Sequence, residues 1–541
     1  MGVHPTAGAG YGAGQTARRD VVWSAALIAS ALLFYLPGNS FGSARFAPDL
    51  AALAPLGFAL LGLLCYLRTE LAVILLPLSI PLYMLPRHVG AHLEFSLSEV
   101  LILLCAAAVA LRLVIGWPHA AEQESDRAPV GRTLFSRSVA LVPATRFWAP
   151  LALFVVAALV ATALALFRSV ALRELRVVVI EPALYFALVV VLLRTPVLVT
   201  RALYAAIGAA VIVGIIALAQ LAFPSLPGLM GVDGAPTMYG VYPHRNNLGL
   251  LLDRALPMAL ALTLWSRGPR RVLGACATAE LALVLLLTPS RGAWLTAAVV
   301  CAAVVALWAP RVRLPVLLGG LLGVLLLVLA ELHPTGALGR LVSLGHGTSS
   351  QARVYVWQSA LRMARDHPIV GVGPDNFLYY YSAWGFRKLA KPPALPAGWV
   401  LPSGNSYLIP GHSYMSEAGH LEPFLSHPHN IVLDVWLSTG LLGLAALAWL
   451  LGLFFIRAHR AVVEPTPNGQ TREALVPVVM ASASVLALLV HGLVDNSYFV
   501  ADLAMLFWLA VAAVAVVDYN QSRPEPRPPM REPSLAGTGS P

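Results

Sequence analysis

The chain has 541 residues, of which 58% are hydrophobic and only 11% are charged, and its mean hydropathy is +0.75. Soluble domains usually carry about 25% charged residues, so this composition excludes a set of soluble domains. It also excludes a disordered chain, which needs low hydrophobicity and high net charge. The class that fits is a polytopic integral membrane protein. Its net charge of +10 at pH 7 matters less than which loops carry it, and we expect no nucleic-acid partner.

A membrane-spanning helix needs about 20 mainly apolar residues, and the sequence contains fourteen segments of this kind. The third carries Pro77, Pro81 and Pro86 and is expected to be kinked or re-entrant. We therefore predict an all-α fold of about 12–14 transmembrane helices. The predicted spans are 21–37, 50–67, 71–86, 97–116, 147–167, 175–194, 199–222, 248–265, 270–288, 292–309, 314–331, 431–456, 475–494 and 499–518.

Arginines in the short loops predict the orientation, because cytoplasmic loops carry the excess of positive charge. Most of these arginines lie on one side if Arg18 and Arg19 are cytoplasmic. The large loop before the last spans then faces outward, into the periplasm if the cell is Gram-negative. The predicted organisation is a disordered cytoplasmic tail at 1–20, transmembrane helices 1–11 over 21–331, a large periplasmic loop at 332–430, transmembrane helices 12–14 over 431–518 and a second disordered cytoplasmic tail at 519–541.

The periplasmic loop contains a segment, 351–366, with the period of an amphipathic helix, and Pro368 is expected to end it. A loop of this length with a helix of its own is typical of a lid or a substrate-binding element. The side chains expected on its apolar face are Val354, Trp357, Leu361 and Ala364.

An arginine-rich turn between the fifth and sixth spans lies on the predicted outer face. Arginines are unusual there, because cytoplasmic loops carry the excess of positive charge. Such a turn is consistent with substrate binding, or with a row of arginines that reach lipid headgroups. Its charged residues are Arg168, Arg173, Glu174, Arg176 and Glu181.

The eighth span opens with His244-Arg245-Asn246-Asn247, where an asparagine would be an ordinary helix cap. Arg254 lies two turns deeper, at about 10 Å into the hydrocarbon by the helix rise. A charge at that depth usually faces a cavity or a partner. The adjacent Asp253 could neutralise it, but neighbouring helical side chains point in different directions, which favours a functional role for Arg254.

Two more polar motifs lie at outer helix ends. Ser290-Arg291-Gly292 forms the turn between the ninth and tenth spans. Its arginine either belongs to a functional site or binds a lipid phosphate. His427-Pro428-His429-Asn430 lies where the chain re-enters the membrane. This motif either forms part of a functional site or is an asparagine cap that follows two solvated histidines. No further ligand is spaced to complete a metal site with these histidines, so we expect neither a metal nor another cofactor.

Several arginines and a histidine pair are thus predicted to share one membrane face. The guanidinium group suits bidentate binding of phosphate, and histidine suits proton transfer near neutral pH. The combination predicts chemistry on a phosphate-bearing lipid.

Five segments form a further pattern: Ser290-Arg291-Gly292, Gln351 to Ala360, His367 to Pro374, His429-Asn430 with Thr439 to Gly443, and His491 to Asp495. In this order, with a single large outer loop before the last spans, they resemble the superfamily of O-antigen ligases and O-antigen polymerases. The resemblance extends over residues 170–515.

The resemblance implies a GT-C-like glycosyltransferase fold in a bacterial inner membrane, with the active site on the periplasmic face, and a donor glycan linked to undecaprenyl pyrophosphate. The glycan would move to a hydroxyl of lipid A–core or of a growing glycan, among membrane lipids, with inversion and without a metal. His429 would act on the acceptor hydroxyl, with His427 as the less favoured neighbour, and Arg291 would stabilise the leaving pyrophosphate. The other residues expected to bind pyrophosphate or glycan are Arg245, Arg353, Arg254, His427, Asn430, Arg173, Arg176 and Glu181.

Several alternatives stay open. An O-antigen or exopolysaccharide polymerase and an enzyme that glycosylates protein side chains belong to the same superfamily. A transporter or flippase of lipid-linked sugars is the alternative from another class, favoured by Glu280, His491 and Asp495, because buried ionisable groups mark transport routes. The aromatic residues of 379–386 either stack on sugar rings or fill the core of the loop. Sugar identities, product length and oligomeric state are left open.

Overall fold

The computed structural model describes residues 8–41, 44–89, 93–115, 145–223, 238–242, 244–332, 349–381, 425–463 and 472–522. Helices make up most of these ranges, and the all-α class predicted from the sequence is confirmed. The strands in the described ranges form two short antiparallel hairpins. They are β1 (Ser40–Phe41) with β2 (Ala44–Arg45), and β3 (Arg87–Val89) with β4 (Leu93–Phe95).

All fourteen predicted spans fall on helices, so the chain is a multi-pass membrane protein. Nine helical segments in the described ranges are long and apolar enough to cross a membrane, and Thr69–Met84 and Trp148–Leu164 are shorter apolar helices. The principal helices are α1 (Gly8–Tyr35), α2 (Ala54–Leu67), α3 (Thr69–Leu75), α4 (Leu97–Ile115), α6 (Trp148–Leu164), α7 (Arg168–Glu174), α8 (Glu181–Leu192), α9 (Pro196–Ala222), α10 (Arg245–Trp265), α11 (Gly268–Leu287), α12 (Arg291–Trp308), α13 (Arg313–Leu332), α15 (Ser349–Asp366), α16 (Phe377–Tyr381), α18 (Ile431–Val463), α19 (Val476–Gly492) and α20 (Ala501–Gln521).

The third predicted span departs from a regular α-helix, as its prolines predict. Helix α3 ends at Leu75 and continues as the 3₁₀-helix η2 (Leu76–Met84), which contains Pro77 and Pro81. Each proline lacks the amide that a regular α-helix needs at that position, so the tighter helical form replaces it.

The prediction of a disordered N-terminal tail was wrong from residue 8 onward. Helix α1 begins at Gly8 and runs without a break into the first span. Several residues of this stretch, such as Ala17 and Arg18, favour helix, so the helix of the span extends through them. Of the predicted tails and loop, residues 1–7, 333–348, 382–424 and 523–541 lie outside the described residues.

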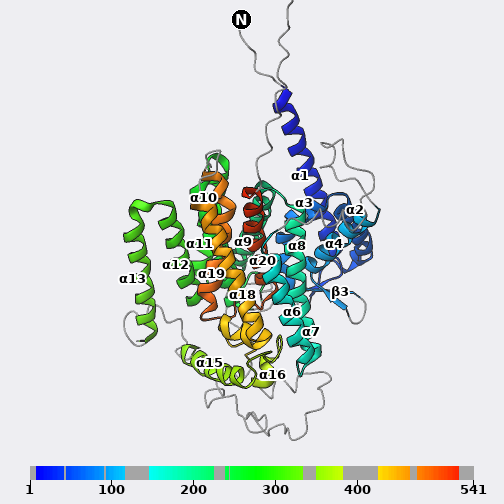
Figure 1. Ribbon diagram of the computed structural model, residues 1–541. Coiled ribbons are helices and arrows are strands. Elements are labelled where there is room, and N and C mark those ends of the chain that lie inside the picture. The colour runs from blue at the N-terminus through cyan, green and yellow to red at the C-terminus, as the bar shows by residue number, and fades with distance from the viewer. Residues whose placement is uncertain are drawn as a thin grey trace, which may run out of the picture.

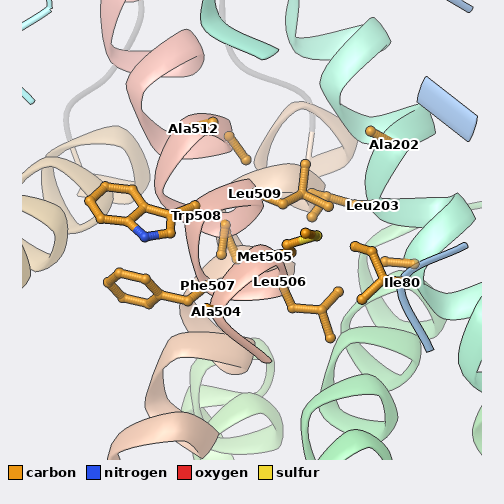
Figure 2. Close-up of a cluster of buried hydrophobic side chains, with 14 of the residues drawn as sticks. Ile80, Ala202, Leu203, Ala504, Met505, Leu506, Phe507, Trp508, Leu509 and Ala512 are labelled. Carbon is orange, nitrogen blue, oxygen red and sulfur yellow. The ribbon is translucent and has the colours of Figure 1, made fainter. Parts of the chain in front are cut away.

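Helix α20 forms the centre of the bundle (Figure 1). Its apolar window is 94% buried, compared with 22% for the peripheral segment Pro48–Leu67, and it packs against α8, α9, α18 and α19. In Figure 2, Met505 of α20 points toward Ile80 of η2 and Leu203 of α9, and Trp508 lies on the opposite side of the helix. A helix that is apolar on all sides is typical of such a central position.

Ion pairs show which helix ends share a side of the bundle. At one end Asp20 of α1 lies 3.4 Å from Arg201 of α9. At the other end, Glu99 of α4 lies 2.8 Å from Arg176. The alternation of predicted spans places the two residues of each pair on the same side of the membrane, and it places the two pairs on opposite sides. In Figure 1 the start of α1 lies opposite α15 and α16, and we call the end that bears α15 and α16 the outer end.

Helix α15 confirms the predicted amphipathic helix, but only part of its predicted apolar face is buried. Ala364 is buried and Trp357 is half-buried, whereas Val354 and Leu361 are 46% and 37% exposed. The buried face also includes Ala360 and Met363, which pack with Ala364, Phe377 and Leu437 in a small second core. Small alanines let α15 approach α18 closely, and this packing selects the face.

Helix α18 is broken at Gly440, where φ is 71° and ψ is −176°, a conformation that is accessible chiefly to glycine. The loop segment 367–374 packs into the break. The carbonyl of Leu437 accepts a hydrogen bond of 2.7 Å from the amide of Val372. Two of the segments that carry the family resemblance are therefore in contact, although the long loop separates them in the sequence.

Gly440→Ala is expected to destabilise the protein by about 1–3 kcal/mol, because the backbone conformation there disfavours any other residue. An added Cβ would also lie 1.9 Å from the carbonyl oxygen of Ile369. Gly452→Ala in the same helix is the control, since its Cβ would meet nothing within 4 Å. Thermal unfolding in detergent measures both variants, and equal melting temperatures would contradict the account.

Candidate functional site

The carboxylate of Asp495 joins three elements at the outer end. Asp495 lies between α19 and α20, and its Oδ1 is 2.5 Å from His429 Nδ1, just before α18. Its Oδ2 is 3.4 Å from a guanidinium nitrogen of Arg353 on α15. The side chain of His429 is 22% exposed, whereas that of Asp495 is 7% exposed. Two predicted site residues therefore meet through an aspartate that was not predicted to be catalytic.

The backbone around His429 fixes the position of its ring. His429 has a φ of 50°, and its carbonyl accepts a hydrogen bond of 3.2 Å from Trp357 Nε1. Asn430 caps α18, because its Oδ1 accepts from the amide of Val432, and its side-chain amide donates to the carbonyl of Leu493. Both ends of Asn430 are thus used within the chain, which favours a positioning role over the predicted substrate contact.

A second histidine–aspartate pair is buried behind Asp495. His491 Nδ1 is hydrogen-bonded to the carboxylate of Asp253 on α10, and His491 Nε2 lies 4.0 Å from Asp495 Oδ2. His491 is 1% exposed and Asp253 is fully buried. Asp253, His491, Asp495 and His429 thus form a continuous sequence of contacts, here called the His–Asp row.

The predicted turn at Ser290, Arg291 and Gly292 lies against this row. Helix α12 begins at Arg291, and a Cβ added to Gly292 would lie 2.7 Å from His491 Nε2. A Cβ added to Gly249 of α10 would lie 3.0 Å from the side chain of Ser290. The two glycines therefore let the turn fit closely between α10 and α19, which places Arg291 next to the row.

Arg245 begins α10 and is half-buried at the outer end. The cap of this helix is His244, whose Nδ1 accepts a hydrogen bond of 3.3 Å from the amide of Asn246. The prediction of an asparagine cap was therefore wrong here, because the lone pair of the imidazole supplies the acceptor.

The location of Arg254 argues against its predicted role in substrate binding. The side chain is 1% exposed, and its guanidinium donates to the backbone carbonyls of Ser497 and Leu503. The adjacent Asp253 has a different partner, His491 of α19. Arg254 therefore holds the connection between α19 and α20, which also carries Asp495.

His427 differs from its neighbour His429 in its surroundings. Its Nδ1 lies 3.3 Å from Asp434 Oδ2. Burial lowers the pKa of His427, but the carboxylates of Asp434, Asp375 and Glu174 together raise it to about 9. Arg173 lies on α7 with Glu174, and its positive charge lowers the pKa of Glu174 and of Asp375. His427 is therefore a cation at neutral pH and is unsuited to act as a base.

Arg176 and Glu181 of the arginine-rich turn form a separate group. Arg176 lies in the π-helix η4 (Leu175–Ile180), with Glu99 at 2.8 Å and the buried Glu181 at 3.5 Å. The side chain of Arg176 is 44% exposed. The arginines of this turn therefore have different surroundings. Arg173 lies near Glu174 and Asp375, which also face His427, whereas Arg176 lies between two other carboxylates.

The aromatic residues of the loop differ in how deeply they are buried. Tyr380 and Tyr381 are buried in the second core, whereas Tyr379 is half-buried against Phe167, with ring centroids 4.9 Å apart. The first two therefore fill the core of the loop. The predicted aromatic residues from 382 onward lie outside the described residues.

The charges around Asp495 determine how His429 can act. Burial raises the pKa of Asp495, but His429, Arg353 and His491 hold that pKa well below its usual range. An ionised Asp495 favours the tautomer of neutral His429 that carries its proton on Nδ1. The lone pair then lies on Nε2, which can accept a proton.

The two histidines of the 427–430 motif do not converge on a common ligand. They pair with different aspartates, Asp434 and Asp495. Within the described ranges, no group of three or more His, Cys, Asp or Glu side chains is arranged to hold a metal ion.

A family model described as O-antigen ligase matches residues 276–448. This segment is similar to the O-antigen ligase family. It runs from α11 into α18 and contains Arg291, Arg353 and His429, so the predicted resemblance is confirmed. The match supports a membrane glycosyltransferase of ligase or polymerase type. No curated protein matches the chain.

Three residues of the His–Asp row lie outside the O-antigen ligase segment. They are Asp253, His491 and Asp495. His491 and Asp495 belong to a segment that carries the family resemblance, but the sequence analysis assigned none of the three a role in catalysis. The spacing of His491 and Asp495 placed the two on adjacent turns. The pairing of Asp495 with His429 joins residues 66 positions apart, and no local pattern predicts it.

Stability is expected to depend on pH through His427. Its pKa is about 9 in the folded protein and about 6.5 in an unfolded chain. Protonated His427 therefore stabilises the fold fully below about pH 6.5, and this stabilisation is lost as the pH rises through 9.

The melting temperature of the wild type should accordingly fall relative to that of His427→Gln as the pH rises over this interval. Unfolding in detergent, followed by tryptophan fluorescence, measures the difference. A difference that stays constant with pH would show that His427 does not carry the proton.

Proposed function

We propose that the protein is an O-antigen ligase of a bacterial inner membrane. It transfers a glycan from undecaprenyl pyrophosphate to a sugar hydroxyl of lipid A–core at the periplasmic face. The observation that carries the proposal is the contact of His429 with the buried carboxylate of Asp495, with Arg291 nearby and the segment 276–448 matching the O-antigen ligase family.

His429 is the general base of the proposed reaction. Its Nε2 accepts the proton of the acceptor hydroxyl while the oxygen attacks the anomeric carbon. The bond between that carbon and the phosphate oxygen breaks, and the lipid pyrophosphate leaves with the electron pair. Attack from the face opposite the leaving group inverts the anomeric centre. The carboxylate of Asp495 stabilises the imidazolium that forms.

Arginines at the outer end neutralise the charge that develops on the pyrophosphate. Arg291 is the first candidate, because it begins α12, where the helix dipole also favours an anion. Arg245 has the same position at the start of α10 and is the second. Arg353 already contacts Asp495, so it shares its charge between the base and the substrate.

The other predicted site residues have lesser proposed roles. Arg173 and the exposed guanidinium of Arg176 contribute to binding of the glycan or of lipid headgroups. Glu181 holds Arg176 in place. Arg254 and Asn430 position the site from within the protein.

A polymerase of the same family would use the same groups, with a lipid-linked glycan as the acceptor. A transporter would need access to both leaflets, whereas the His–Asp row and the arginines at the starts of α10 and α12 gather at the outer end. The location of these residues on one side of the membrane favours an enzyme over a transporter.

The acceptor is tested with the purified protein in liposomes, supplied with an undecaprenyl-pyrophosphate oligosaccharide in the presence of EDTA. Product that forms only when lipid A–core is added supports the ligase. Longer lipid-linked chains without lipid A–core would replace this proposal with a polymerase. Transfer of the lipid-linked sugar between leaflets with no new glycosidic bond would contradict both.

His429→Ala is expected to lower the rate of transfer by about 10²–10⁴-fold, as for the loss of a general base. Arg291→Ala is expected to lower it by about 10²–10³-fold, as for the loss of a group that stabilises developing charge. The matched controls are His459→Ala and Arg311→Ala. His459 is an exposed residue near the far end of α18, and Arg311 is an exposed residue of the 3₁₀-helix Pro310–Val312 that follows α12. Wild-type transfer by either site variant, in protein that binds the donor, would contradict its assigned role.

A further inference from the structure

The carboxylate of Asp495 is shared among several donors. Its Oδ1 accepts from His429 Nδ1 at 2.5 Å and from the amide of Asn496 at 2.8 Å. Its Oδ2 faces Arg353 at 3.4 Å and His491 Nε2 at 4.0 Å. Because these groups share one carboxylate, the charge on any of them affects how strongly Asp495 holds the others.

His491 lies between two carboxylates. Nδ1 contacts Asp253 and Nε2 faces Asp495. A neutral imidazole would present a lone pair to one of them, whereas both nitrogens of an imidazolium are donors. A buried charge is retained only where it is paired, and here a carboxylate lies on each side. The protonated form of His491 therefore matches its surroundings.

We propose that the buried His491–Asp253 pair is a positioning element that limits the proton affinity of His429 by supplying a fixed positive charge to Asp495. The inference rests on the proposed role of His429 as the base. A base that bound its proton too tightly would be occupied at the working pH and could not accept the acceptor's proton. His491 contacts no substrate in this account and acts through Asp495.

The charged groups on the elements around His491 have both signs. Asp253 and Arg254 come from α10, Arg291 from α12, Arg353 from α15, His429 from the start of α18 and Asp502 from α20. Gly292 leaves the space that the ring of His491 occupies.

The test uses His491→Asn, because the asparagine amide can replace Nδ1 as the donor to Asp253 while the charge is removed. Asp253→Asn is the second variant, since it keeps an acceptor for Nδ1 and removes the carboxylate that favours the imidazolium. Thr263→Val is the control. Thr263 is a part-buried residue farther along α10 that bonds Thr278 of α11, far from the row.

Two readouts follow the protonation of His429 as the pH is varied. The first is the acidic limb of the pH–rate profile for glycan transfer. The second needs no activity: diethyl pyrocarbonate modifies unprotonated imidazole, and mass spectrometry of the peptide containing His429 gives the rate of modification. Both midpoints are expected to rise by about one pH unit in His491→Asn and Asp253→Asn, and to stay at the wild-type value in Thr263→Val.

Midpoints that stay at the wild-type pH in both variants, or that fall, would overturn the inference, since His491 would then act only in packing. Failure of the proposed function gives a different result. If His429→Ala transferred glycan at the wild-type rate, His429 would not be the base, whatever the modification midpoints of the two variants.

Discussion

The outer end of this bundle depends on one buried carboxylate. Asp495 lies where the chain passes from α19 to α20, and its contacts reach α15 through Arg353, the start of α18 through His429 and α10 through His491 and Asp253. An ionised group removed from water is costly unless it is paired, and removal of one partner leaves an uncompensated charge. The donors around Asp495 are therefore needed for the fold and, in the proposed mechanism, for the chemistry as well.

Close packing at glycine residues makes this arrangement possible. Gly249 and Gly292 bring α10, α12 and α19 together, and the break at Gly440 lets the loop segment 367–374 dock into α18. The segment that matches the O-antigen ligase family, 276–448, supplies Arg291, Arg353 and His429. The helices before and after it supply the carboxylates and the second histidine. The proposed site is thus completed by parts of the chain beyond the matched segment.

Composition and hydrophobic runs were sufficient to predict the helical membrane fold, because a span of about 20 apolar residues has few alternatives in a bilayer. Motifs at helix ends also indicated Arg291, Arg353 and His429. The sequence could not predict that Asp495 pairs with His429, since this contact depends on how distant helices pack. For the same reason it placed Arg254 in the site, although its charge is taken up by the carbonyls of Ser497 and Leu503. The buried face of α15 likewise depends on its contact with α18.

The central claim is that His429 and Asp495 act as one catalytic unit. The most direct test compares the rates of glycan transfer by His429→Ala, Asp495→Ala and the double variant, with folding checked by thermal unfolding. If the two side chains act together, the double variant should be no slower than His429→Ala alone, because the aspartate works only through the histidine. Losses that multiply in the double variant would mean that the two residues act independently, and would contradict the account.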